Sequence, residues 1–162
     1  MARPAKPATR KSKTDTSLTL TRSFDAAPEA VFQAWIDPVQ VARWIGPRRI
    51  TAVVEKMEAR EGGSYRIAMH EADGTAHTVQ GAYREFAPPA RLVFTWAWLA
   101  ESGKPGHESL VTIELRPIGK KTEMTLHHER FESKERRDSH SHGWGESFDK
   151  LAEALAGMSS RR

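Results

Sequence analysis

His128 has the side chain best suited to hydrogen-bonding or acid–base chemistry in this sequence. It alternates with Met124 and Leu126, so these three residues are expected on one face of a strand, with His127 on the other face. A neutral imidazole there can hydrogen-bond a ligand carbonyl or hydroxyl, or act as a base. The alternative is a core histidine satisfied by a neighbouring group, and the sequence favours that alternative.

Other polar side chains are placed for chemistry by the same kind of alternation. Arg22 is expected on the inner face of the first strand, where its guanidinium can reach a ligand carboxylate or pair with Glu85. A pair at a cavity edge is the favoured role. Tyr65 and Tyr83 add two hydroxyls, although the facing of Tyr83 is left open by the pattern.

A metal or cofactor site is not expected. The chain has seven histidines, but His140 and His142 are two residues apart, which is the wrong spacing for one helix face. The segment from His70 to Gly74 begins like a zinc-protease motif but has glycine where the second histidine is required. No nucleophile elbow and no phosphate-binding loop occurs in the chain.

The composition is that of an ordinary globular protein. The chain has 162 residues, of which 38% are hydrophobic and 28% charged, and it contains no cysteine. Disulfides, thiolate catalysis and cysteine-ligated metals are therefore excluded. No apolar run approaches the roughly 18 residues of a membrane span, and the N-terminus lacks a secretory signal. We expect a cytoplasmic protein that does not enter membranes.

The positive charge is concentrated at the ends of the chain. Residues 1–14 carry five basic residues and no acidic residue, so taking these five charges from the net charge of +4 leaves −1. The expectation is a disordered basic tail at residues 1–15 and one domain at residues 16–158. A few charges without aromatic residues give only weak attraction to nucleic acid, so a nucleic-acid partner is not expected.

These side chains must be positioned by a sheet and a long helix. Residues 18–24 alternate as a first strand, and two short helices follow around Pro28–Trp35 and Val41–Trp44. Six strands separated by turns come next, among them the Asp73–Gly74 hairpin signal. The short connections predict an antiparallel sheet with one apolar face.

The final segment predicts an amphipathic helix that covers this apolar face. Its stripe has spacings of four, three and four residues and consists of Trp144, Phe148, Leu151 and Leu155. Ser133 is expected to cap its start. Gly143 and Gly145 flank Trp144, and we expect them to allow a close approach to the sheet or a bend. The fold class is α+β, and a curved sheet would leave a pocket under the helix.

Several ordered segments resemble a known protein family. They are Phe24–Glu29, Asp37–Pro38, Arg43–Pro47, Glu61–Gly63, Pro88–Trp96 and His142–Trp144. Over about residues 17–157, their order and spacing resemble the family related to the C-terminal domain of the activator of Hsp90 ATPase, in the START-like, Bet v 1-like superfamily. The sequence departs from the pattern at Ile45, where many relatives have a second tryptophan.

The resemblance implies a helix-grip fold, in which a curved antiparallel sheet of about seven strands surrounds a long C-terminal helix, with two short helices after the first strand. It also implies binding of a hydrophobic or aromatic small molecule without a cofactor. The expected ligand-binding residues are Tyr65, Phe94, Trp96, Val111, Ile113, Met124, Leu126 and His128 on the sheet, with Trp144 and Phe148 on the helix.

Three alternatives remain open from the sequence. The ten residues can form an ordinary filled core rather than a pocket. The protein can be a cyclase- or hydrolase-like enzyme acting on polyketide-type substrates, with His128, Tyr65, Arg22 and Glu85 as the polar groups. It can also be a chaperone-linked partner of an Hsp90-type ATPase.

Overall fold

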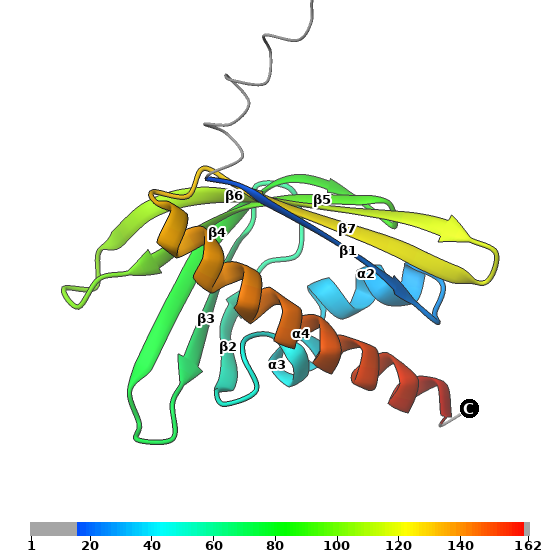
Figure 1. The fold of residues 1–162 in the computed structure, drawn as a ribbon, viewed down its shortest axis with the longest axis horizontal. Coiled ribbons are helices and arrows are strands. Elements are labelled where there is room, and N and C mark those ends of the chain that lie inside the picture. Colours follow the sequence, from blue (N-terminus) through cyan, green and yellow to red (C-terminus); the bar gives the residue numbers. More distant parts are fainter. Residues whose placement is uncertain (1–15, 161–162) are drawn as a thin grey trace, which may run out of the picture.

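The computed structural model describes residues 16–160, and the predicted basic tail at residues 1–15 lies outside them. Within these residues the chain forms seven strands and three helices (Figure 1). The elements in chain order are β1 (Leu18–Phe24), α2 (Pro28–Ile36), α3 (Pro38–Trp44), β2 (Thr51–Met57), β3 (Ser64–His70), β4 (Ala76–Ala87), β5 (Arg91–Leu99), β6 (Pro105–Ile118), β7 (Lys121–Glu129) and α4 (Lys134–Ser160).

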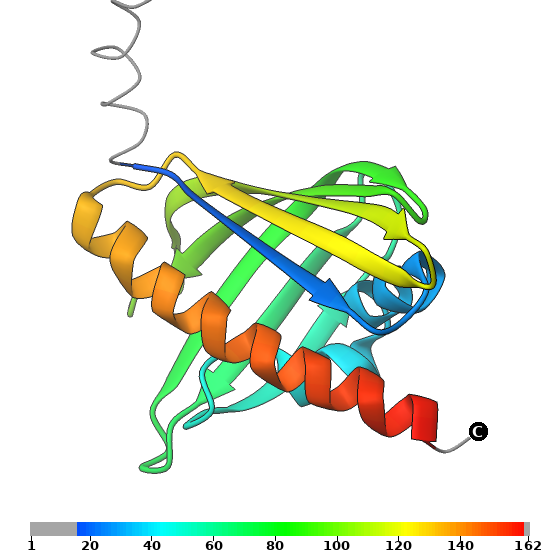
Figure 2. The same ribbon diagram turned by 45° about the vertical axis from the view of Figure 1, so that its right-hand side comes forward.

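All seven strands belong to one antiparallel sheet in the order β1-β7-β6-β5-β4-β3-β2. The two strands at the edges, β1 and β2, are consecutive in the chain, because α2 and α3 carry the chain from one edge to the other. The sheet is curved, and α4 runs diagonally across its open side (Figure 2). The predicted helix-grip architecture is thus confirmed.

Short-range signals explain where the helices begin. Proline occupies the first turn of both α2 and α3, where its missing N–H costs no helical hydrogen bond. The carboxylate of Asp37 caps α3 by accepting from the N–H of Val39 at 3.0 Å. The Ser133 hydroxyl accepts from the N–H of Arg136 at 3.1 Å, which confirms the predicted cap of α4.

The core lies between the concave face of the sheet and the three helices. All four residues of the predicted stripe on α4, Trp144, Phe148, Leu151 and Leu155, are buried, with 0–5% of their surface exposed. Burying side chains of this size stabilises the folded chain by roughly 1.5–3 kcal/mol each. Docking of α4 on the sheet is therefore a major part of the stability of the fold.

Glycines in β4 and in α4 have very different surroundings. A β-carbon on Gly81 in β4 would lie 1.9 Å from the carbonyl oxygen of Thr95, so glycine is required there for strands β4 and β5 to approach. By contrast, a β-carbon on Gly145 would meet nothing within 4 Å, and one on Gly143 would only touch Pro47 at 3.9 Å. The expected close approach to the sheet at these two helical glycines is wrong.

The β5–β6 turn ends before Pro105, where β6 begins and is paired with Leu99 of β5. None of the helices in the described part of the chain is long and apolar enough to cross a membrane.

Candidate functional site

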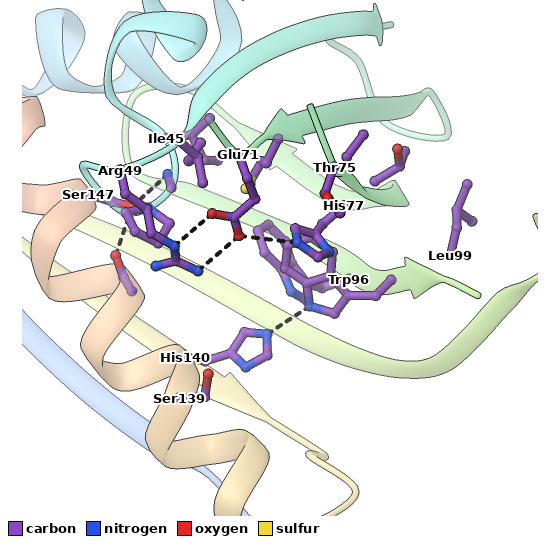
Figure 3. A pocket seen from close by; sticks show the side chains of 18 of the residues that line it. Ile45, Arg49, Glu71, Thr75, His77, Trp96, Leu99, Ser139, His140 and Ser147 are labelled. Carbon is purple, nitrogen blue, oxygen red and sulfur yellow. Dashed lines mark hydrogen bonds and ion pairs between the residues drawn. The ribbon is translucent and has the colours of Figure 1, made fainter. Parts of the chain in front are cut away.

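A cavity of about 650 Å³ lies between the first half of α4 and one end of the sheet (Figure 3). Its walls come from the segment between α3 and β2, the β3–β4 hairpin, the end of β5 and the turn after it, and α4 between Arg136 and Ser147. Because these elements are distant in sequence, the cavity exists only once the sheet has curved around the helix. Its volume falls within the roughly 300–1,000 Å³ of ligand pockets.

Three tryptophans form an aromatic wall of this cavity. Trp96 and Trp98 come from β5, and Trp144 comes from α4. The ring of Trp96 lies at the centre of the group, 5.7 Å from the ring of Trp98 and 5.0 Å from that of Trp144. Rings in such an arrangement offer a large apolar contact area to a flat ligand.

His140 is the histidine of α4 that lines the cavity. Its Nδ1 lies 2.7 Å from the carbonyl oxygen of Arg136 and must donate to it, while its Nε2 accepts from the indole N–H of Trp98 at 2.9 Å. These two bonds define a neutral imidazole with its proton on Nδ1. Burial lowers the pKa of His140 below its ordinary value, which keeps the ring neutral.

An ion pair lies on the opposite side of the cavity, between the α3–β2 segment and the β3–β4 hairpin (Figure 3). The guanidinium of Arg49 donates to both carboxylate oxygens of Glu71, at 3.0 and 3.3 Å, and His77 lies 3.2 Å from the same carboxylate. The hydrogen bonds from Arg49 are the main reason that the pKa of Glu71 is lowered. The side chain of Arg136, also on the wall, makes no ion pair with any described residue.

The α3–β2 segment is fixed to α4 by hydrogen bonds. The buried hydroxyl of Ser147 accepts from the N–H of Gly46 at 2.8 Å and donates to the carbonyl of Gly143 at 3.0 Å. The ammonium of Lys150 donates to the carbonyl of Pro47 at 3.3 Å. These bonds hold the neighbouring Ile45, which lines the cavity, against the helix.

A second and much smaller cavity, of about 20 Å³, lies deeper in the core. Tyr65, Tyr83 and Phe94 are among the residues around it. Ile45 and Trp96 line both cavities, so these two side chains form the partition between them. Ile45 therefore bounds the inner side of the open cavity.

The ten predicted ligand-binding residues occupy three different environments. Trp96 and Trp144 line the large cavity, and Tyr65 and Phe94 line the small one together with Trp96. The remaining six are at most 1% exposed and line neither cavity: Val111, Ile113, Met124, Leu126, His128 and Phe148. In the structure these six form the packed core beneath the site.

His128 is a buried histidine with both ring nitrogens bonded. The indole N–H of Trp144 donates to its Nδ1 at 3.0 Å, so the ring proton is on Nε2 and is donated to the hydroxyl of Ser109 at 2.7 Å. Ser109 in turn donates to the carbonyl of Trp96 at 3.1 Å. Burial lowers the pKa of His128 well below its ordinary value. This is the satisfied core histidine that the sequence favoured.

The four polar groups of the enzyme alternative do not meet. Arg22 pairs with Asp149 of α4 at 3.0 Å rather than with Glu85, which instead accepts from Arg91 at 2.8 Å. The hydroxyl of Tyr65 donates to the carbonyl of Thr95 at 2.5 Å. The expected pair of Arg22 with Glu85 is wrong because β1 and β4 are separated by three strands in the sheet.

Sequence reasoning missed much of the cavity wall. Arg49, Glu71, His77 and His140 come from a loop, a hairpin and the polar start of α4, where no apolar alternation marks a residue as interior. Trp98 shares the predicted face of Phe94 and Trp96 and could have been included from that signal.

The sequence model of the family described as "Activator of Hsp90 ATPase homolog 1-like protein" matches residues 25–156. The chain belongs to this family. The resemblance found in the sequence is therefore confirmed, and the matched residues include every element of the cavity wall. No curated protein matches the chain.

Solved structures of bacterial proteins agree with this family assignment. The AHSA1 protein from Silicibacter pomeroyi is 30% identical with a TM-score of 0.80, covering 86% of this chain and 97% of its own. A protein from Arthrobacter aurescens is 27% identical with a TM-score of 0.81, and the match covers 88% of this chain and 87% of that protein. A protein from Chromobacterium violaceum is 27% identical with a TM-score of 0.79, and the match covers 85% of this chain and 95% of that protein.

Proposed function

We propose that this member of the family binds a small molecule with a flat apolar body in the cavity between α4 and the β3–β5 end of the sheet. The observation that carries the proposal is the 650 Å³ cavity with Trp96, Trp98 and Trp144 on one wall. Polar groups from Arg49, Glu71, His77, Arg136 and His140 surround the aromatic wall. An apolar surface with a few placed polar groups is typical of ligand sites.

The site differs from the one expected from the sequence. The ligand contacts the ends of the strands and the first half of α4, while Val111, Ile113, Met124 and Leu126 support the site from below without touching it. Trp96 and Trp144 are the two predicted residues that contact the ligand directly in this proposal.

Native mass spectrometry of the purified protein, followed by thermal-shift screening with fatty acids, flavonoids and polyketide-like aromatics, tests the proposal. A co-purifying mass or a saturable stabilisation is expected. Ser139→Trp should abolish the stabilisation, because Ser139 lies on the cavity wall. His142→Trp is the matched control, because His142 is exposed on the same helix outside the cavity. Equal stabilisation of both variants would rule out this cavity as the site.

A role as partner of a chaperone ATPase is the second candidate, and membership of a family described by its likeness to an Hsp90 ATPase activator favours it. Stimulation of ATP hydrolysis by a purified Hsp90-type ATPase is the direct assay. Stimulation that persists in Ser139→Trp would support a role independent of the cavity. A clean mass without a ligand, together with such stimulation, would favour this candidate over ligand binding.

A further inference from the structure

The five tryptophans of the chain differ in what their indole N–H groups bind. Four donate to an acceptor within the protein at 2.9–3.3 Å. The pairs are Trp35 with the sulfur of Met124, Trp44 with the carbonyl of Ala34, Trp98 with His140, and Trp144 with His128. The N–H of Trp96 is buried and has no partner among the described residues.

This unpaired donor is unusual for its position. Trp96 is only 4% exposed, and buried side-chain donors nearly always have a partner, because losing water without gaining another bond is unfavourable. Its ring also lines both the open cavity and the small inner one. The unpaired group therefore belongs to a residue at the site where the ligand is proposed to bind.

The neighbouring side chains are already committed to other bonds. The rings of His128 and His140 are centred 5.8 and 6.3 Å from the ring of Trp96, but each accepts from another tryptophan and donates to an oxygen. The other close rings belong to Phe94, Trp98 and Trp144, which offer no conventional acceptor. None of these rings offers Trp96 a free acceptor, and no other described residue accepts from its N–H.

We propose that Trp96 is the polar anchor of the site and that its indole N–H donates to a carbonyl oxygen on an aromatic ligand. This inference rests on the proposed function. The aromatic body would pack on the tryptophan wall, and the carbonyl would reach the partition formed by Ile45 and Trp96. The indole N–H can donate a hydrogen bond but cannot accept one. It therefore favours a ligand that carries a carbonyl over the same ring system without oxygen.

The matched probes are 1-tetralone and tetralin, which share a fused ring skeleton and differ by one carbonyl oxygen. Calorimetric titration of the full chain should show tighter binding of 1-tetralone. Trp96→Phe keeps an aromatic ring but removes the donor, so 1-tetralone should lose roughly 3- to 10-fold more affinity than tetralin. Trp98→Phe is the control, because the N–H of Trp98 already donates to His140. This variant should change the affinity for both probes by the same factor.

A spectrum of the protein with ¹⁵N-labelled tryptophan gives an independent readout. The indole N–H signal that disappears in Trp96→Phe should move further downfield with 1-tetralone than with tetralin. The inner cavity, at about 20 Å³, is large enough for one water molecule. If a resident water already satisfies the donor, both probes will shift the signal alike, and the inference is overturned.

The calorimetric outcomes separate the inference from the function on which it rests. If both probes bind and Trp96→Phe leaves their affinity ratio unchanged, Trp96 is not the anchor, but the cavity still binds ligands. If neither probe binds the wild-type chain and screening finds no stabilising compound, both proposals fail.

Discussion

The indole N–H of Trp144 donates to Nδ1 of His128 at 3.0 Å, and this bond joins α4 to the C-terminal end of β7 within the buried core. Trp144 also lines the large cavity, so a helix residue of the proposed ligand site is held in place by a sheet residue that lies outside it. The bond fixes the tautomer of His128 and, through Ser109, connects helix, β7 and β6 in one chain of donors and acceptors.

Replacing His128 by alanine should therefore destabilise the fold. The change leaves the N–H of Trp144 without an acceptor and opens a cavity among buried residues, so we expect a loss of about 3 kcal/mol in the free energy of unfolding. Urea denaturation measures it. His127→Ala is the control from the opposite face of the same strand, where a change within about 0.5 kcal/mol is expected. Equal losses in both variants would contradict the structural role of His128.

Stability should fall as the solution is acidified below about pH 6.5. Burial lowers the pKa of His128 and of His140, so below the unfolded value of about 6.5 the unfolded chain binds protons that the folded chain does not. Each histidine contributes up to roughly 1.4 kcal/mol per pH unit between that value and its own lowered pKa. Both contributions are fully present above about pH 6.5.

Urea titrations at pH 7.5 and 5.5 check this pH dependence. His140→Gln should lose part of the dependence, because glutamine does not titrate. If the stability of His140→Gln depended on pH as strongly as that of the wild type, His140 would not contribute to the pH dependence.

Two glycine-to-alanine changes should have opposite effects on stability. Gly81→Ala places a methyl group against the carbonyl of Thr95 and the ring of Tyr65, so we expect a loss of at least ~2 kcal/mol. Gly145→Ala meets nothing within 4 Å in the interior of α4, where alanine should gain about 1 kcal/mol from its higher helix propensity. Thermal unfolding of the two variants is the measurement. A destabilised Gly145→Ala would show that this glycine has a role beyond the helix.

Ile45→Trp should reduce binding while leaving the fold intact. Ile45 lines both cavities, and a larger ring at this position would occupy the space where the ligand is proposed to meet Trp96. Affinity for 1-tetralone should fall more than roughly tenfold, which corresponds to about 1.4 kcal/mol. Val39→Trp on the exposed surface of α3 should change nothing, since Val39 is 63% exposed and lies outside both cavities. Unchanged affinity in Ile45→Trp would place the ligand elsewhere.

The sequence by itself determined which segments form strands and helices, and most of the residues that are buried in the core. Alternation along the strands, the proline and serine signals at helix starts, and the stripe from Trp144 to Leu155 are local patterns, and the structure follows each of them. Local patterns are reliable here because every strand has one buried face and α4 has one buried stripe. The sequence also favoured a satisfied core role for His128, which its two hydrogen bonds support.

Only the tertiary structure decided which apolar residues contact empty space. Val111 and Trp96 both follow the inward pattern of their strands, but Val111 lies under packed side chains and Trp96 lies where α4 and the sheet diverge. The same holds for Arg49 and Glu71, whose pairing depends on a loop and a hairpin that meet across the cavity. Alternation records which side of a sheet a residue faces, whereas the curvature of the sheet and the crossing of the helix determine where the space between them is left open.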